Sequence, residues 1–261
     1  QGFIAALLGS LKGRKDLPHG DLIITHIKKH GMHYDPSLHS LLIEIYGKCG
    51  NIHGARLLFD DVSPRPKRAW KAIIRAYVQG GHYNEAFYLW NQLWQEASIP
   101  DMFTFVSILT TFGGIRDPSN GQRIHGLVVC NGFVSDVAVG TALVNMYGKS
   151  SCLLNAERVF HGMNERNVVT WNTFICGYVH HREGGYKVLK HVHRMLEEGI
   201  MPNNITYMSI FGACETILDI VEAKRFHSGL INKHVNFEAD TAVGTALVNV
   251  YGKCGDLSRA H

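Results

Sequence analysis

Apolar residues recur along this chain with the spacing of one face of an α-helix. Between 137 and 163 they follow one another by three or four residues, with one interruption at a turn around Gly148. Stretches 102–114 and 168–179 show the same spacing. Such spacing predicts amphipathic helices, and two of them flanking a glycine predict a helical hairpin. The apolar positions of the clearest hairpin are Val139, Ala142, Leu143, Met146, Tyr147, Ala156, Val159, Phe160 and Met163.

The sequence of one of these predicted helices occurs twice in almost identical form. "VGTALVNMYGK" begins at Val139 and "VGTALVNVYGK" at Val243, and a looser copy, "SLLIEIYGKCG", begins at Ser40. Aligned on Ser40, Thr141 and Thr245, successive copies lie 101 and 104 residues apart, which exceeds the roughly 33 to 47 residues of a single helical repeat. Trp70 and Trp171 open a second pair of equivalent stretches, and 102–114 resembles 204–215. The sequence therefore predicts a cycle of three hairpin types.

Hairpins of this size cannot bury their apolar faces alone and must stack on their neighbours. The pattern therefore predicts an all-α protein, a right-handed α-solenoid of helix-turn-helix units. With seven prolines and no change of composition along the chain, we expect one continuous body.

Composition narrows the function only slightly. Lys and Arg outnumber Asp and Glu by 26 to 22, a surplus that permits but does not indicate a nucleic-acid partner. No apolar run is long enough to span a membrane. Six scattered cysteines without a C-x-x-C pair favour a reducing compartment. Because the sequence begins at Gln1 and stops within its repeat pattern, we expect it to be part of a longer chain.

Several segments carry the pattern of a known family. "NMYGK", "AERVFHGMNERNVVTWNTFICGYV" and "LEEGIMPN" resemble the pentatricopeptide repeat (PPR) proteins of the plant PLS class, whose P, L and S units alternate. The resemblance covers essentially the whole chain. The units would be L from Gln1 to Asp35, S from Pro36 to Pro66, P from Lys67 to Asp101, L from Met102 to Asp136, S from Val137 to Asn167, P from Val168 to Asn203, L from Asn204 to Asp240, and a partial S from Thr241 to His261.

This resemblance implies binding of single-stranded RNA, with one unit for each base. Unstacked bases expose hydrogen-bonding edges that two or three side chains of a helical repeat can contact. In the family, the fifth and the last residue of a unit discriminate the base, and a Thr/Asn pair favours adenine whereas Asn/Asn favours cytosine and then uracil. The residues carried over to these base-contacting positions are Ser40, Lys71, Asp101, Thr141, Asn167, Asn172, Asn203 and Thr245.

Some units depart from the family pattern. Pro66, the partner expected for Ser40, has no side-chain hydrogen-bonding group, and Lys71 is unusual as a fifth residue. The L units carry Val106 and Met208 as fifth residues, which we expect to space or stack rather than discriminate bases.

Two functional interpretations have structural alternatives. Val169, the second residue of its unit, is a candidate for packing against a base face, but it also suits an ordinary hairpin edge. Thr and Asn suit helix caps and turns, so helix capping is the alternative for the two central pairs, Thr141 with Asn167 and Asn172 with Asn203.

The resemblance further implies an organellar RNA-processing factor, located in a mitochondrion or chloroplast and most consistent with C-to-U RNA editing. Its partners would be RNA, editing-complex proteins and a deaminase domain outside this chain, without a membrane. Exposed terminal hairpins could also mediate self-association. The alternative is a protein-interaction scaffold that binds polypeptide without base-specific contacts.

Enzyme and metal chemistry find little support, and we expect no catalytic residue, cofactor or metal. The histidines of "HIKKHGMH", from His26 to His33, lack a complete ligand set for zinc. "HRE" from His181 to Glu183 matches half of a deaminase signature, but the P-C-x-x-C half is absent. The sequence also lacks a phosphate-binding glycine loop and a nucleophile elbow.

Overall fold

The computed structural model describes residues 36–96, 100–179, 184–232 and 241–255, which contain thirteen α-helices and no β-strand. They belong to two compact parts, 1–133 and 134–261, and each part is described by itself. The first part holds α3 (Pro36–Lys48), α4 (Ile52–Asp60), α5 (Lys67–Gln79), α6 (Tyr83–Gln95), α7 (Met102–Ile115) and α8 (Pro118–Cys130). The second part holds α9 (Val137–Lys149), α10 (Leu153–Gly162), α11 (Val168–Cys176), α12 (Gly184–Glu197), α13 (Asn204–Ile217), α14 (Ile220–Asn232) and α15 (Thr241–Lys253).

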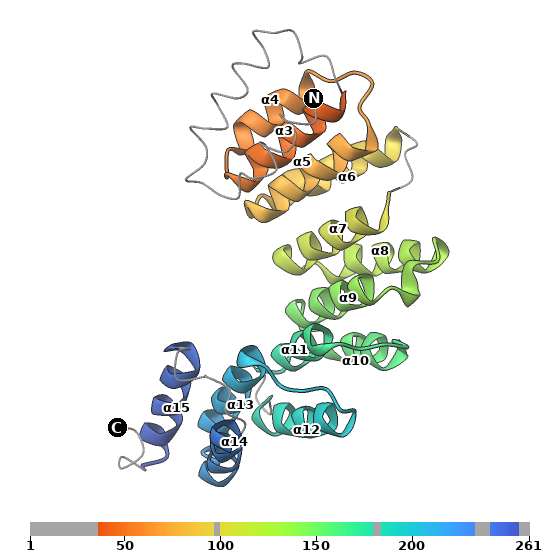
Figure 1. Cartoon of the computed structure of the whole chain (residues 1–261). Helices are drawn as coiled ribbons and strands as arrows, with labels where there is room; N and C mark the ends of the chain where they lie inside the picture. Colours follow the sequence, from red (N-terminus) through yellow and green to blue (C-terminus); the bar gives the residue numbers. More distant parts are fainter. Residues whose placement is uncertain (1–35, 97–99, 180–183, 233–240, 256–261) are drawn as a thin grey trace. The chain divides into compact units, whose positions relative to one another are not determined.

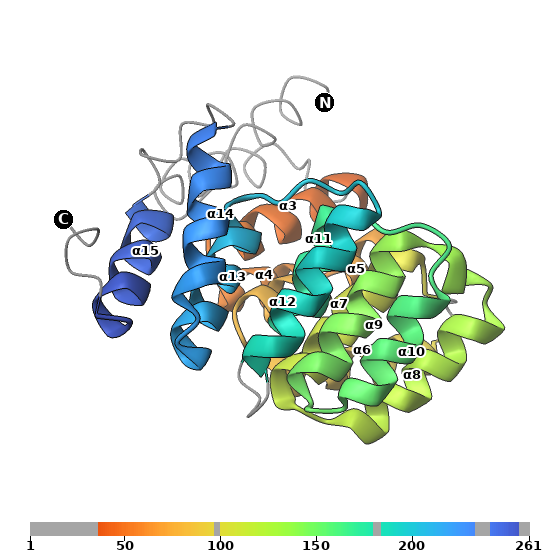
Figure 2. The same cartoon turned by 90° about the horizontal axis from the view of Figure 1, so that it is seen from below.

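Consecutive helices form antiparallel hairpins (Figures 1 and 2). The first helices of neighbouring hairpins also stack: α3 on α5 and α5 on α7 in the first part, and α9 on α11, α11 on α13 and α13 on α15 in the second. Each first helix begins at the first residue of a predicted unit. The assignment of units as P, L or S stays a prediction, and the first L unit lies outside the described residues.

Short polar side chains fix where the first helices begin. Asp101, Asp136, Asn167 and Asn203 have extended backbone conformations and accept a hydrogen bond from the backbone N–H three residues later, as N-cap residues do. Pro66 precedes α5 without a side-chain cap. Four of the predicted last residues are therefore the N-caps of the next helix.

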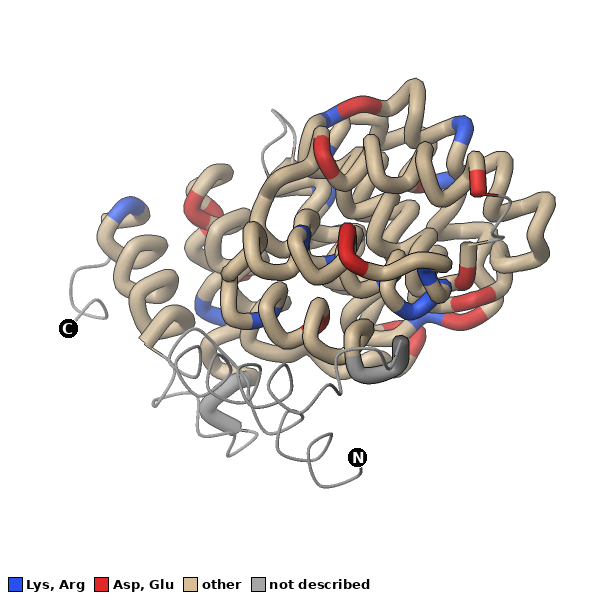
Figure 3. Tube along the Cα trace, turned by 90° about the horizontal axis from the view of Figure 1, so that it is seen from above, with Lys and Arg blue, Asp and Glu red and all other residues tan. Residues whose placement is uncertain are grey.

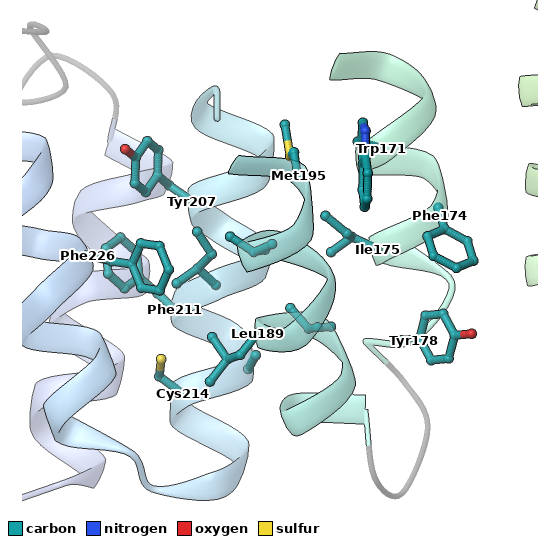
Figure 4. Close-up of a cluster of buried hydrophobic side chains, with 14 of the residues drawn as sticks. Trp171, Phe174, Ile175, Tyr178, Leu189, Met195, Tyr207, Phe211, Cys214 and Phe226 are labelled. Carbon is teal, nitrogen blue, oxygen red and sulfur yellow. The ribbon is translucent and has the colours of Figure 1, made fainter. Parts of the chain in front are cut away.

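The core of the second part lies between stacked hairpins. Figure 4 shows side chains of α11, α12, α13 and α14 gathered between these helices. The rings of Phe160 and Phe174 stack with centroids 4.0 Å apart, and Trp171 meets Phe160 edge-on at 4.7 Å. All three side chains are almost completely buried. Burial of such large rings makes a major contribution to the stability of the stack.

Helix α11 is shorter than the apolar spacing predicts. The pattern extends to Tyr178, but the α-helix ends at Cys176, and the N–H groups of Gly177, Tyr178 and Val179 bond to carbonyls three residues earlier. The chain has tightened into a turn with that bonding pattern. Tyr178 is nevertheless fully buried, because it follows directly on the helix face that enters the core.

The junctions before α5 and before α11 are built in the same way. In the first part, Arg65 lies over the ring of Phe59 at 4.9 Å and 3.4 Å from Glu96. In the second, Arg166 lies over Phe160 at 5.4 Å and 3.2 Å from Glu198. Each arginine thereby ties the end of one hairpin to the end of the next.

Close packing of first helices depends on small residues. A methyl group on Gly47 in α3 would lie 2.5 Å from Cβ of Ala76 in α5, too close for any ordinary contact. The equivalent Gly148 in α9 faces Gly177, and a methyl group there would lie 3.5 Å from the Gly177 Cα, an ordinary van der Waals distance. Both interfaces therefore have room for one methyl group. In the α3–α5 interface Ala76 supplies it, whereas in the equivalent α9–α11 interface neither Gly148 nor Gly177 does.

We predict that Arg166→Ala destabilises the second part more than Glu198→Ala does. Arg166 is mostly buried and donates hydrogen bonds to the carbonyls of Phe160, at 3.3 Å, and Met163, at 3.0 Å. Losing these charge-assisted bonds should cost about 2 kcal/mol, whereas loss of the partly exposed ion pair alone should cost less than about 1 kcal/mol. Urea unfolding of the two variants measures the difference, and equal losses would refute the dominance of the carbonyl contacts.

The two equivalent glycines should respond oppositely to alanine. Gly148→Ala should stabilise the chain by up to about 1 kcal/mol, because alanine is the better helix former and the site has space. Gly47→Ala should lower the thermal midpoint, because its methyl group overlaps Ala76. The double variant Gly47→Ala, Ala76→Gly should recover most of that loss. Thermal unfolding monitored by circular dichroism tests all three, and destabilisation by both single changes would contradict the steric argument.

Candidate nucleic-acid interface

The predicted base-contacting residues lie near the N-terminal ends of the first helices. The fifth residue of a unit stands in the second turn of its first helix, and the last residue caps the first helix of the next unit. Because first helices stack side by side, the two residues meet although about 30 positions separate them in sequence. Stacking of the first helices thus brings together two polar side chains that are far apart in the sequence.

Asn172 and Asn203 form the clearest pair. The Asn172 Nδ2 donates to Asn203 Oδ1 at 2.9 Å, and Thr206 donates its hydroxyl to Asn172 Oδ1 at 2.6 Å. Asn172 exposes only 5% of its surface, whereas Asn203 is half-buried. The pair therefore offers solvent a small polar area whose atoms are held in place by hydrogen bonds.

Thr141 and Asn167 are connected through a third residue. The Thr141 hydroxyl lies 2.8 Å from the Thr170 hydroxyl, which in turn donates to Asn167 Oδ1 at 3.1 Å. Thr141 is half-buried and Asn167 is exposed. This pair is again a polar group on α9 linked to the cap of α11.

Lys71 and Asp101 form an ion pair instead of a hydrogen-bonded neutral pair. Lys71 Nζ lies 3.6 Å from Asp101 Oδ2 and 3.7 Å from the ring centroid of Phe103. Burial alone would raise the pKa of Asp101, but hydrogen bonds from Thr104 and the charge of Lys71 outweigh it and lower that pKa. The unusual Lys71 thus has two partners within the protein, an acid and an aromatic face.

Two further predicted positions are arranged differently. Ser40 is buried, with 1% of its surface exposed, and Pro66 offers no side-chain hydrogen bond. Thr245 is exposed and donates its hydroxyl to the carbonyl of Thr241 at 2.6 Å. Asp240, the last residue of the preceding unit, lies outside the described residues.

Exposed apolar side chains flank the polar pairs. Val169, the predicted base-packing residue, is 58% exposed, and the equivalent second residues Phe103 and Ile205 are 55% and 53% exposed. The sequence analysis named only Val169. Phe103 and Ile205 could have been found from the same rule, since each follows the first residue of its unit and is set apart from the apolar face. Of the fifth residues in the L units, Met208 is exposed and Val106 is half-exposed.

The capping alternative is confirmed for Asn167 and Asn203, but not for Thr141 and Asn172, which lie within α9 and α11. Asn167 accepts from the N–H of Thr170 at 3.0 Å, and Asn203 accepts from the N–H of Thr206 at 3.2 Å. Each cap uses the Oδ1 atom and leaves the amide nitrogen to other partners. Capping and ligand contact are therefore compatible at these two residues.

Charges of both signs are interspersed. Figure 3 shows Lys and Arg, and Asp and Glu, distributed over the described part of the chain. In the part of the chain that the structure describes, no group of three or more His, Cys, Asp or Glu side chains could hold a metal ion. The histidine segments 26–33 and 181–183 lie outside the described residues.

Two further properties concern the chain as a whole. Its six cysteines are all free thiols within the described residues. None of the described helices has both the length and the apolar character needed to cross a membrane.

Family models match this chain in four places. A model described as PPR repeat family matches residues 166–215, and a model described as PPR repeat matches residues 37–62, 68–96 and 141–168. These segments include α9 and α11, where the polar pairs of the second part lie.

Similar proteins carry the same repeats. The chloroplastic pentatricopeptide repeat-containing protein At1g11290 of Arabidopsis thaliana is 32% identical over 84% of this chain and 27% of its own length. The putative mitochondrial protein At3g13770 of the same plant is 30% identical over 98% of this chain and 40% of its length. The chain thus spans about a quarter to two fifths of these relatives.

Solved structures agree with the helical arrangement. The crystal structure of PPR10 in complex with an 18-nucleotide psaJ RNA element matches 93% of this chain and 36% of that protein, with a TM-score of 0.74 and 17% identity. PPR10 from maize matches 98% and 37%, with a TM-score of 0.73 and 19% identity. The predicted all-α helical repeat solenoid is confirmed, and the chain belongs to the pentatricopeptide repeat protein family.

Proposed function

We propose that this chain binds single-stranded RNA through the N-terminal ends of its first helices. The observation that carries this proposal is the pairing of polar side chains from neighbouring units, Asn172 with Asn203 and Thr141 with Asn167, beside exposed Val169. Each pair offers hydrogen-bonding atoms for one base edge, and the apolar neighbour suits a base face. Relatives in the family and a fold neighbour solved with RNA support the same function.

The two central pairs would contact successive bases. Thr141 with Asn167 should select adenine, and Asn172 with Asn203 should select cytosine and then uracil. The equivalent exposed residues Phe103 and Ile205 extend the candidates for packing against bases to α7 and α13. Within the wider PLS class, such specificity would serve an organellar RNA-processing factor, with C-to-U editing as the leading role and any deaminase acting from outside this chain. The organellar names of several relatives favour this location.

A protein-binding scaffold is the second candidate. Lys71 and Asp101, which stand at two predicted base-contacting positions, form an ion pair with each other, and Ser40 is buried. These units alone would suit a polypeptide groove as well as RNA. The two functions differ in their salt dependence, because contacts to phosphates release counterions and weaken as salt rises.

We predict that the chain binds short single-stranded RNAs that carry adenine followed by cytosine opposite the central units. Thr141→Ala and Asn172→Ala should each weaken binding about fivefold to tenfold, because each removes a polar group whose net contribution is about 1 kcal/mol. Affinity should fall with rising salt, with a logarithmic slope of about 0.7 for each phosphate contacted. Equilibrium binding to labelled RNAs at several salt concentrations gives both quantities.

The matched control is Thr216→Ala in α13. Thr216 donates its hydroxyl to the carbonyl of Ala213 at 2.7 Å, near the opposite end of the helix from the polar pair. It should leave RNA affinity unchanged. No binding to any RNA, with the helical circular dichroism signal intact, would favour the protein-scaffold function instead.

A further inference from the structure

A buried threonine stands beside each described polar pair. Thr104, Thr170 and Thr206 are the third residues of α7, α11 and α13, and they expose 4%, 0% and 0% of their surfaces. Buried hydroxyl groups require hydrogen-bond partners. In all three, the hydroxyl reaches the cap residue of its own helix. In α11 and α13 it also reaches the fifth residue of the preceding unit.

The hydrogen bonds around Thr206 have a fixed direction. The backbone N–H of Asn203 donates to Thr206 Oγ1 at 3.1 Å, and the backbone N–H of Thr206 donates to Asn203 Oδ1 at 3.2 Å. A backbone N–H cannot accept. The hydroxyl therefore keeps its proton for Asn172 Oδ1, which at 2.6 Å is its nearest acceptor.

This direction determines how the amide of Asn172 is turned. Its oxygen faces the Thr206 hydroxyl, and its nitrogen donates to Asn203 Oδ1 at 2.9 Å. Turning the amide over would place two oxygen atoms against each other at Asn203. These hydrogen bonds among Asn172, Asn203 and Thr206 do not use one N–H of the Asn172 amide or either N–H of the Asn203 amide. The pair therefore has N–H groups that can donate to a ligand.

Thr206 donates its hydroxyl proton to the fifth residue of the preceding unit, whereas Thr170 accepts a proton from that residue, Thr141. Asn167 Oδ1 can only accept, and it receives both the Thr170 N–H at 3.0 Å and the Thr170 hydroxyl at 3.1 Å. Either hydroxyl could donate across the 2.8 Å contact between Thr141 and Thr170. If the Thr170 proton is directed to Asn167 Oδ1 and Thr141 donates to Thr170, both contacts contain a hydrogen bond, whereas the reverse direction leaves the Thr170–Asn167 contact without a proton. The Thr141 hydroxyl proton is then occupied, and its oxygen is left as an acceptor.

We propose that Thr170 and Thr206 are positioning residues that set which atoms of the preceding unit's base-contacting pair donate and which accept. This inference rests on the proposed RNA binding and deepens it. The threonines do not touch the base. They act through Thr141 and Asn172.

The assigned directions agree with the expected bases. An acceptor at Thr141 and a donor at Asn167 complement adenine, which presents an amino group beside the acceptor N1. Donors at Asn172 and Asn203 complement cytosine, whose N3 and O2 both accept, better than uracil, whose N3 carries a proton. Without the threonines, the Thr141 hydroxyl could donate and the Asn172 amide could turn over. Base preference would then weaken.

The test is to change each threonine to valine, which has the same shape without the hydroxyl. Valine already occupies the equivalent buried position in α9 and α15, at Val139 and Val243, so the change fits the helix interface. Thr206→Ser retains the hydroxyl and serves as the rescue variant. Thr216→Val, in the same helix as Thr206 but distant from the polar pair, is the control.

The readout is the ratio of dissociation constants for two RNAs that differ in one base. Because both values come from the same protein sample, the ratio does not depend on the folded fraction. We expect Thr170→Val to reduce the preference for adenine over guanine about fivefold, the equivalent of one net hydrogen bond. Thr206→Val should reduce the preference for cytosine over uracil by a similar factor. Thr206→Ser and Thr216→Val should keep the wild-type ratios.

Two other outcomes would overturn the inference in distinguishable ways. Valine variants that bind RNA with wild-type ratios would show that the threonines only cap helices, and RNA binding itself would stand. A wild-type chain that binds no RNA, or binds all four bases equally at these positions, would remove the base-specific function and the inference with it.

Discussion

The hydrogen bond that the backbone N–H of a helix's third residue donates to the side chain of the preceding cap residue is the contact on which the rest of this structure depends. It fixes the start of each first helix at Asp101, Asp136, Asn167 and Asn203. Two of these residues also contact the fifth residue of the neighbouring first helix, Asp101 at Lys71 and Asn203 at Asn172. One interaction therefore sets helix register and places the groups available to a ligand.

The core and the polar edge have different requirements. Phe160, Trp171 and Phe174 need only be large, apolar and correctly spaced, since burial stabilises them without fixed polar geometry. The polar edge needs particular atoms, because a buried hydroxyl such as that of Thr206 must be satisfied. The polar pairs differ from unit to unit, whereas the junctions before α5 and before α11 share the same Arg–Glu contacts.

Sequence spacing was sufficient to predict the helical hairpins and their stacking, since the period of apolar residues directly reflects a buried helix face. The resemblance to the PPR family, and not the spacing, indicated the residues of the polar pairs. Sequence spacing did not identify Phe103 and Ile205 as exposed, nor Thr170 and Thr206 as links between units. Those roles depend on contacts between residues about 30 positions apart. Spacing within one helix carries no information about such contacts, and the Lys71–Asp101 ion pair was unforeseen for the same reason.

Equivalent helix interfaces in this chain differ by one methyl group, and this difference affects how such an array can evolve. Gly47 packs against Ala76, whereas Gly148 packs against Gly177. Each helix is thus adapted to its own neighbour rather than to a common template. Recombination that duplicates or transplants one hairpin would bring together surfaces that had not been matched. Arrays of this kind should lengthen most readily when neighbouring hairpins are copied together, so the heritable module is larger than the repeat.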